Sequence, residues 1–143
     1  MLALKMGPKD VRLFMNKLLV EDVFDFFEFR EAYISSFIRF ELNAQSGEPV
    51  SWKEIRPYAF NILKGGRKPA SMRFVLSYPK DGLAGIEPSA RALFLNIIFE
   101  EESVLITTGF SAGKFTLDKG PEAVWDAYVR DFLRNGGMGF EEQ

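Results

Sequence analysis

The sequence contains no cysteine and no histidine among its 143 residues. Without thiols the protein has no disulfides, no zinc thiolate site and no cysteine nucleophile. Without imidazoles, Ser-His-Asp triads, Cys-His dyads, histidine metal ligands and histidine-based pH switching are excluded as well. An enzyme of this composition would depend on carboxylate, lysine, tyrosine or hydroxyl chemistry, or on Mg²⁺.

The sequence also lacks an excess of positive charge and any long apolar run. Its net charge is −2 and its pI is near 5.3, which makes nucleic acid an unlikely partner because domains that coat it are usually basic. No window is long enough to span a membrane. Residues 1–10 lack the apolar region of a signal peptide, so we expect a cytoplasmic protein that does not enter the membrane.

Phenylalanine is abundant, with 15 residues against two tryptophans and four tyrosines. A phenylalanine ring has no polar group, so we expect most of these rings to be buried in the core or in an interface. The length fits a single globular domain over residues 1–143. Residues 138–143 are expected to form a loose tail.

Three segments carry helix signals. Pro8 opens the first, which we expect to end near Glu21 or Asp22. Ser51 and Glu54 match a capping box at the start of a central helix. Pro57 in that helix predicts a kink and two helical pieces. The third helix begins at Gly120-Pro121, carries a wide apolar stripe and ends at Gly136-Gly137.

The remaining apolar segments read as strands. We expect strands at residues 2–5, 24–29, 32–42 and 72–78, and two or three more between 93 and 117. A charged turn at 30–31, a helical turn at 88–91 and an exposed hairpin turn at 100–102 separate some of them. Residues 93–99 are apolar on both alternating faces except at Asn96, which predicts a central strand covered on both sides. The order of elements predicts an α+β fold. Its sheet is mainly antiparallel and twisted, with about five to seven strands and N-terminal, central and C-terminal helices.

Two polar segments are candidate anion sites. In residues 107–114, small hydroxyls and glycines at a turn could present backbone N–H groups to an anion, although the spacing is not that of a P-loop. An ordinary β-turn is the favoured alternative. The candidates here are Thr107, Thr108, Ser111 and Lys114.

The second segment is a glycine-rich run of cations after the central helix. It could meet a phosphate or an acidic partner, although a solvated helix end whose cations favour the helix dipole is the more common case. The candidates are Arg56, Lys64, Arg67 and Lys68. The anion-site interpretation gains support only if the two segments pack side by side.

The carboxylates show no recognisable motif. Glu100, Glu101 and Glu102 lie on the expected hairpin turn, where charge discourages edge pairing, and Asp118 is placed to cap the last helix. Asp126 completes the group. We therefore predict no catalytic residue, no metal site and no cofactor.

Nearly the whole chain resembles a small family of uncharacterised proteins from Firmicutes, known only as a domain of unknown function. The segments that carry the resemblance are VRLFMNKLL at 11–19, WKEIRP at 52–57, KGGRKP at 64–69, LFLNI at 93–97, TTG at 107–109 and FTLDK at 115–119. The resemblance implies one complete domain. It implies no activity, cofactor or catalytic residue.

Three functions remain open from the sequence. The favoured one is a non-enzymatic binding or protein-interaction module, whose partner is another protein or a second copy of the chain. It follows from the excess of phenylalanine and the missing catalytic residue types. The alternative is a binding protein or enzyme for an anionic or phosphorylated small molecule. Nucleic-acid binding through one basic face ranks last.

Overall fold

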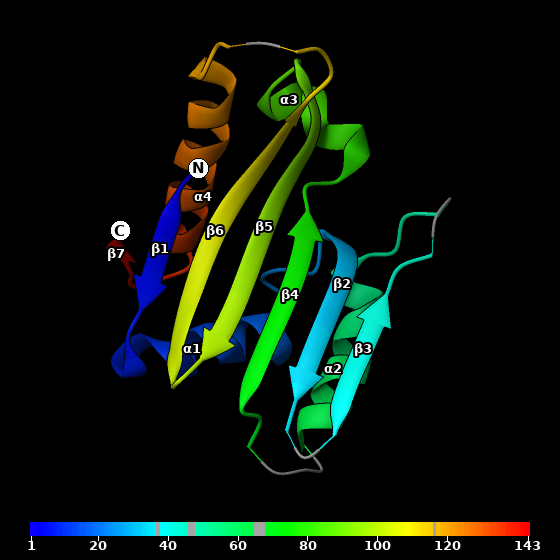
Figure 1. Ribbon diagram of the computed structural model, residues 1–143, viewed down its shortest axis with the longest axis vertical. Coiled ribbons are helices and arrows are strands. Elements are labelled where there is room, and N and C mark those ends of the chain that lie inside the picture. The colour runs from blue at the N-terminus through cyan, green and yellow to red at the C-terminus, as the bar shows by residue number, and fades with distance from the viewer. Residues whose placement is uncertain (37, 46–47, 65–67, 116) are drawn as a thin grey trace.

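A single antiparallel sheet backed by helices forms the fold, in a computed structural model that describes residues 1–36, 38–45, 48–64, 68–115 and 117–143 (Figure 1). The strands are β1 (Ala3–Met6), β2 (Glu28–Ser35), β3 (Arg39–Asn43), β4 (Ser71–Ser77), β5 (Ala90–Glu100), β6 (Ser103–Ala112) and β7 (Glu141–Glu142). The helices are α1 (Pro8–Leu19), α2 (Trp52–Lys64), α3 (Leu83–Ile86) and α4 (Gly120–Asn135), with a 3₁₀ turn η1 (Lys80–Gly82).

Within the described residues the sheet has seven strands in the order β3-β2-β4-β5-β6-β1-β7. Every pairing between neighbours is antiparallel. Helices α1, α2 and α4 lie behind the sheet in the view of Figure 1, and its front face is open. The prediction of an α+β fold with an antiparallel sheet and helices at the N-terminus, middle and C-terminus is therefore confirmed.

The core lies between the helices and one face of the sheet. From the sheet come alternate residues such as Leu95, Ile97 and Phe74, and from the helices come Phe14 and Trp125, all almost completely buried. Most of the described phenylalanines belong to this core or pack against it. The expectation that most of the rings are buried is met in part, because several of the rings that pack against the core are only half-buried. Phe115 is the clearest exception, at 92% exposed.

Strand β5 is the central strand of the seven, as residues 93–99 predict, but it is covered on one side only. Leu93, Leu95 and Ile97 are buried against the helices. On the open face Phe94 and Ile98 are only half-buried, because their cover comes from neighbouring strands and no described helix packs there. The prediction of cover on both faces is wrong.

The phenylalanine-rich segment at 24–29 is mostly a turn. Only its last two residues belong to β2, and Phe27 N–H donates to Phe24 O at 3.1 Å. The rings of Phe24 and Phe132 meet edge to face at 5.3 Å, so these apolar residues serve the core from a turn. Apolar content alone cannot separate this case from a strand.

Two expected turns and one expected strand also differ. Residues 30–31 lie inside β2, where a register shift against β4 marks a bulge at Arg30. The expected strand at 32–42 is a hairpin, because β2 ends at Ser35 and β3 begins at Arg39. The helical turn expected at 88–91 is wrong, since Ala90 begins β5 and the helical residues of this connection are those of η1 and α3.

The helix signals give nearly correct boundaries. Helix α1 ends at Leu19, two or three residues before the expected end. The capping box is confirmed: Ser51 N–H donates to Glu54 Oε2 at 3.0 Å, and Glu54 N–H donates to Ser51 Oγ at 3.3 Å. Pro57 lies within one continuous helix. The prediction of two pieces is wrong because proline removes only one backbone donor.

Helix α4 ends in a Schellman motif at Gly137, whose φ of +74° requires glycine. Met138 N–H donates to Leu133 O at 3.0 Å and Gly137 N–H to Arg134 O at 2.9 Å. The chain then turns back, buries Met138 and pairs β7 with β1. The prediction of a loose tail at residues 138–143 is wrong, because the cap directs the chain onto the sheet.

Candidate functional site

Residues 107–112 lie in β6 and form no turn. The prediction of a turn here is wrong. Gly109 is needed inside the strand because it leaves room for the Phe94 side chain: a Cβ at Gly109 would lie 3.2 Å from Phe94 Cβ. Thr107 occupies the open face, since the buried positions of β6 alternate with it. Thr108 is 1% exposed. Its Oγ1 accepts from Leu2 N–H at 2.9 Å.

The cations predicted after the central helix do not form one site, and two of them make separate structural contacts. Arg56 donates to both carboxylate oxygens of Asp25, at 2.7 and 2.9 Å, and to Val20 O at 2.9 Å. The hydrogen bond to Asp25 raises the pKa of Arg56. Lys68 pairs with Glu102 at 2.7 Å. Lys64 is exposed at the end of α2, and Arg67 lies outside the described residues.

The two basic segments stand at opposite ends of the sheet. Glu102 places Lys68 beside the turn between β5 and β6, whereas Lys114 follows the other end of β6. Strand β6 has ten residues, so its ends lie about 30 Å apart, and Figure 1 shows the two loops at opposite ends of the molecule. Lys114 lines a different cavity, of about 580 Å³, with Pro121. The structure does not bring the two segments into one cleft.

A different set of cations does converge, where β5 begins and where β4 ends before η1. Arg30, Lys80 and Arg91 line a pocket of about 310 Å³, together with the ring of Phe94. The described residues that line it include no carboxylate. The polar groups are the hydroxyls of Ser77, Tyr78 and Ser111, and of all the residues predicted as a site only Ser111 is among them.

Arg30 is held in place before any ligand arrives. The bulge in β2 sets its position, and its Nε donates to Ser77 Oγ at 2.9 Å. Its Cζ lies 6.0 Å from the centroid of the Phe94 ring, at the outer limit of a cation–π contact. Ser77 is 1% exposed, so this hydroxyl anchors Arg30 from inside the sheet. The nearest acid is Glu28, whose Oε2 is 3.6 Å from a terminal nitrogen of Arg30.

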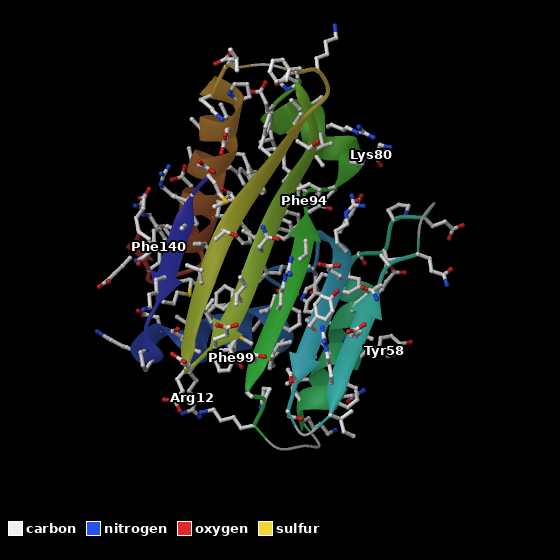
Figure 2. The ribbon with its side chains drawn as sticks, in the orientation of Figure 1. Arg12, Tyr58, Lys80, Phe94, Phe99 and Phe140 are labelled. Carbon is white, nitrogen blue, oxygen red and sulfur yellow. The ribbon has the colours of Figure 1, made fainter. Side chains whose placement is uncertain are left out.

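Lys80 and Arg91 complete the positive charge. Lys80 begins η1, where its backbone N–H donates to Glu28 Oε1 at 3.1 Å, and Arg91 lies at the start of β5. Neither side chain forms an ion pair with any residue that the structure describes. Figure 2 labels Lys80 and Phe94 near the same end of the sheet. The local field is positive although the whole chain is slightly acidic.

An aromatic cluster supports Tyr78, one of the residues that line the pocket. Tyr78 lies edge to face with Trp125 at 6.0 Å and with Tyr128 at 5.5 Å. Burial and a hydrogen bond with Tyr78 raise the pKa of Tyr128 to about 12. Trp125 Nε1 donates to Phe94 O at 3.0 Å. Helix α4 is thereby fixed against the strand that forms the floor of the pocket.

Little in the sequence indicates this pocket. Arg30, Lys80 and Arg91 are up to 61 positions apart in the sequence, and no spacing rule connects them. The one local signal is Arg91, a cation between two alanines at the start of an apolar strand. That signal is too common to identify a site.

Other kinds of site find less support. None of the described helices has the length and apolarity needed to cross a membrane. Among the residues that the structure describes, no three acidic side chains are grouped so that they could hold a metal ion.

The sequence matches a family described as a family of unknown function, DUF5721, over residues 41–141. The chain belongs to this family. No curated protein and no solved structure matches it. The matched range of DUF5721 includes Lys80, Arg91, Phe94 and Ser111, whereas Arg30 precedes it. The resemblance to an uncharacterised family is thus confirmed, and the restriction to Firmicutes stays a prediction.

Proposed function

We propose that this DUF5721 protein is a non-enzymatic binding protein and that its ligand is a small anion, held in the pocket above Phe94. The observation that carries the proposal is the convergence of Arg30, Lys80 and Arg91 from three segments, with no carboxylate among the described residues that line the pocket. Glu28 contacts Arg30 from outside this lining. Such a cavity concentrates anions from solution. A surface where charges merely mix would contain acids as well.

The chemistry of the lining favours a phosphate or a carboxylate. A guanidinium group binds both in a two-pronged manner, and the hydrogen bond from Arg30 to Ser77 lowers the entropy lost when Arg30 takes up a ligand. Lys80 and Arg91 supply further charge, and Ser111 supplies a hydroxyl. The apolar floor at Phe94 suits the carbon part of an organic anion.

The volume limits the size of the ligand. At about 310 Å³, the pocket is at the small end of the range for ligand sites. The competing interaction is the contact between Arg30 and Glu28 at 3.6 Å. Arg30 is 47% exposed in that contact, so solvent weakens it and a bound anion displaces it at little cost.

Calorimetry with inorganic phosphate at low ionic strength tests the proposal. We expect saturable binding that weakens about tenfold in Arg91→Ala and in Lys80→Ala, since each removes one charge–charge contact. Lys53→Ala is the matched control, because Lys53 is an exposed cation on α2 outside the pocket. Equal phosphate affinity in all four proteins, or no binding to the unmodified chain, would contradict the proposal.

Binding to a second copy or to another protein, and a cytoplasmic location, stay predictions. Exposed apolar side chains support the first of them, among them Phe115 at 92% and Leu117 at 83% exposed. Light scattering over a range of protein concentrations measures self-association directly. A monomer at every concentration would leave another protein as the partner.

A further inference from the structure

The two edges of the sheet differ in what they offer to another chain. At one edge, β7 has only two residues. At the other edge, β3 has five residues and, among the strands that the structure describes, pairs with β2 alone. Ala44 N–H donates to Arg30 O at 2.9 Å and Ser36 N–H to Ile38 O at 3.1 Å. Even-numbered residues of β3 therefore bond to β2, and the alternation of an antiparallel ladder turns the N–H and C=O groups of the odd-numbered residues outward.

Edge strands in proteins are usually protected by charged side chains, above all lysine, by proline, by a bulge or by extreme shortness. Strand β3 reads Arg-Phe-Glu-Leu-Asn and has no lysine, no proline and no bulge, since its register with β2 is unbroken over five pairs. Arg39 and Glu41, its two charged residues, pair with each other at 3.1 Å. The outward groups of Arg39, Glu41 and Asn43 thus form a neutral row of unprotected donors and acceptors.

A groove accompanies this edge on the helix side. A cavity of about 650 Å³ lies between β3 and the start of α2, with an apolar lining from Phe29, Leu42, Val50 and Ile55. Glu48 also lines it, and its carboxylate has no ion-pair partner in the part of the chain that the structure describes. A strand added to β3 would direct every second side chain to the same side as Leu42, toward this cavity.

Helix α2 extends the apolar wall beside the edge. Tyr58 follows Ile55 by three residues, so the two side chains lie on one side of the helix. Tyr58 is 65% exposed, and in Figure 2 it projects from α2 on the outer side of β3. An exposed aromatic ring beside an open strand edge is the arrangement by which an added strand is held through both its backbone and its side chains.

We propose that β3 and this groove bind an extended peptide segment of another protein, which adds to the sheet as an eighth strand. One large apolar side chain of the peptide occupies the cavity beside Leu42 and Ile55. A neighbouring lysine or arginine of the peptide meets Glu48, the unpaired acid of the groove. Two copies of this chain joined edge to edge over five residues would fall well short of the roughly 1,200 Å² that a stable dimer buries, so a peptide is the better occupant.

The test selects peptides from a library of random twelve-residue sequences displayed on phage, with the full chain as bait. We expect the selected peptides to share one large apolar residue with a basic residue close to it. Synthetic copies should shift the amide resonances of β3 and of the first half of α2. Selection of no peptide, or resonance shifts at the Phe94 pocket instead, would overturn the proposal.

Single substitutions separate this mode of binding from others. Glu41→Pro removes an outward N–H and leaves the β2 ladder intact, and we expect it to weaken peptide binding at least tenfold. Tyr58→Ala should weaken it severalfold, whereas Phe60→Ala, the matched control on the same helix, should leave it unchanged. If Glu41→Pro does not fold, Glu48→Lys serves instead and should reverse the preference for basic peptides. Unchanged affinity in the folded edge variants, or a dimer that Glu41→Pro abolishes, would show that the occupant is not an added peptide.

Discussion

Thr108 Oγ1 donates a hydrogen bond to Asp126 Oδ1 at 2.5 Å. The same oxygen accepts from Leu2 N–H at 2.9 Å, so one buried hydroxyl connects the segment before β1, strand β6 and helix α4. Removal of the hydroxyl would take this hydrogen bond from both Leu2 N–H and the Asp126 carboxylate. The contact explains why a threonine occupies this apolar face of the sheet.

Thr108→Val should lower the free energy of unfolding by about 1–3 kcal/mol, because it keeps the shape of the side chain and leaves two polar groups without a partner. Urea denaturation measures the change. Thr107→Val is the control, since Thr107 lies on the open face and we expect a change within about 0.5 kcal/mol. Equal effects at the two positions would show that the hydroxyl of Thr108 has no special role.

Arg56→Lys should lower the free energy of unfolding by about 1–2 kcal/mol, because an ammonium group cannot make the paired hydrogen bonds to Asp25 and also reach Val20 O. Asp25 is only 11% exposed in this ion pair, so water replaces the lost contacts poorly. A double-mutant cycle with Asp25→Asn isolates the pair. A coupling free energy near zero would contradict a structural role for Arg56.

The hairpin between β5 and β6 turns through two residues in the left-handed region, Glu101 at φ +50° and Glu102 at φ +62°. Asn and Gly adopt this conformation with less strain, so the double substitution Glu101→Asn and Glu102→Gly should raise the stability by about 1–2 kcal/mol. The ion pair lost with Lys68 matters little, because both side chains are 67% exposed. Thermal denaturation measures the gain. A lower midpoint in the double variant than in Lys68→Ala would refute the strain argument.

Tyr128 should remain protonated in the folded protein after the exposed tyrosines have ionised. Burial raises its pKa from 10 to about 12, whereas the unfolded chain loses this proton near pH 10. The stability that this group contributes is therefore complete below pH 10 and is lost as the pH rises from 10 to 12. Absorbance at the phenolate band measures the titration. In Tyr128→Phe the late step should vanish, and its persistence would assign it to another tyrosine.

Local signals in the sequence predicted the helices well. Two of these signals are the capping box of Ser51 and Glu54 and the glycines after α4. Both act through backbone groups only a few residues away, so a short stretch of sequence is enough to predict their effect. The sheet was predicted less well because apolar residues serve strands and core-facing turns equally. Phe24 and Phe27 show this, since both are buried in a turn.

The pocket could not be predicted because it depends on the order of strands. Arg30 meets Phe94 only because β4 lies between β2 and β5 and ends at Ser77. The role of Gly109 could not be predicted for the same reason, since its lack of a side chain leaves room for the Phe94 ring on the neighbouring strand. Threonine and glycine at 107–109 are typical of a turn, and the long-range contact with Phe94 is what makes this segment a strand.

The place of β1 in the sheet has a consequence for biosynthesis. Its sheet partners are residues 104–107 of β6 and the two residues of β7, so about 100 residues separate Leu4 from Ile106, its partner across the ladder. At roughly 5–20 residues per second on the ribosome, β1 waits about 5–20 s for its first neighbour. Its buried face, Leu4 and Met6, stays without its sheet neighbours during that time. Chaperones that recognise short apolar segments could therefore bind this strand during that time.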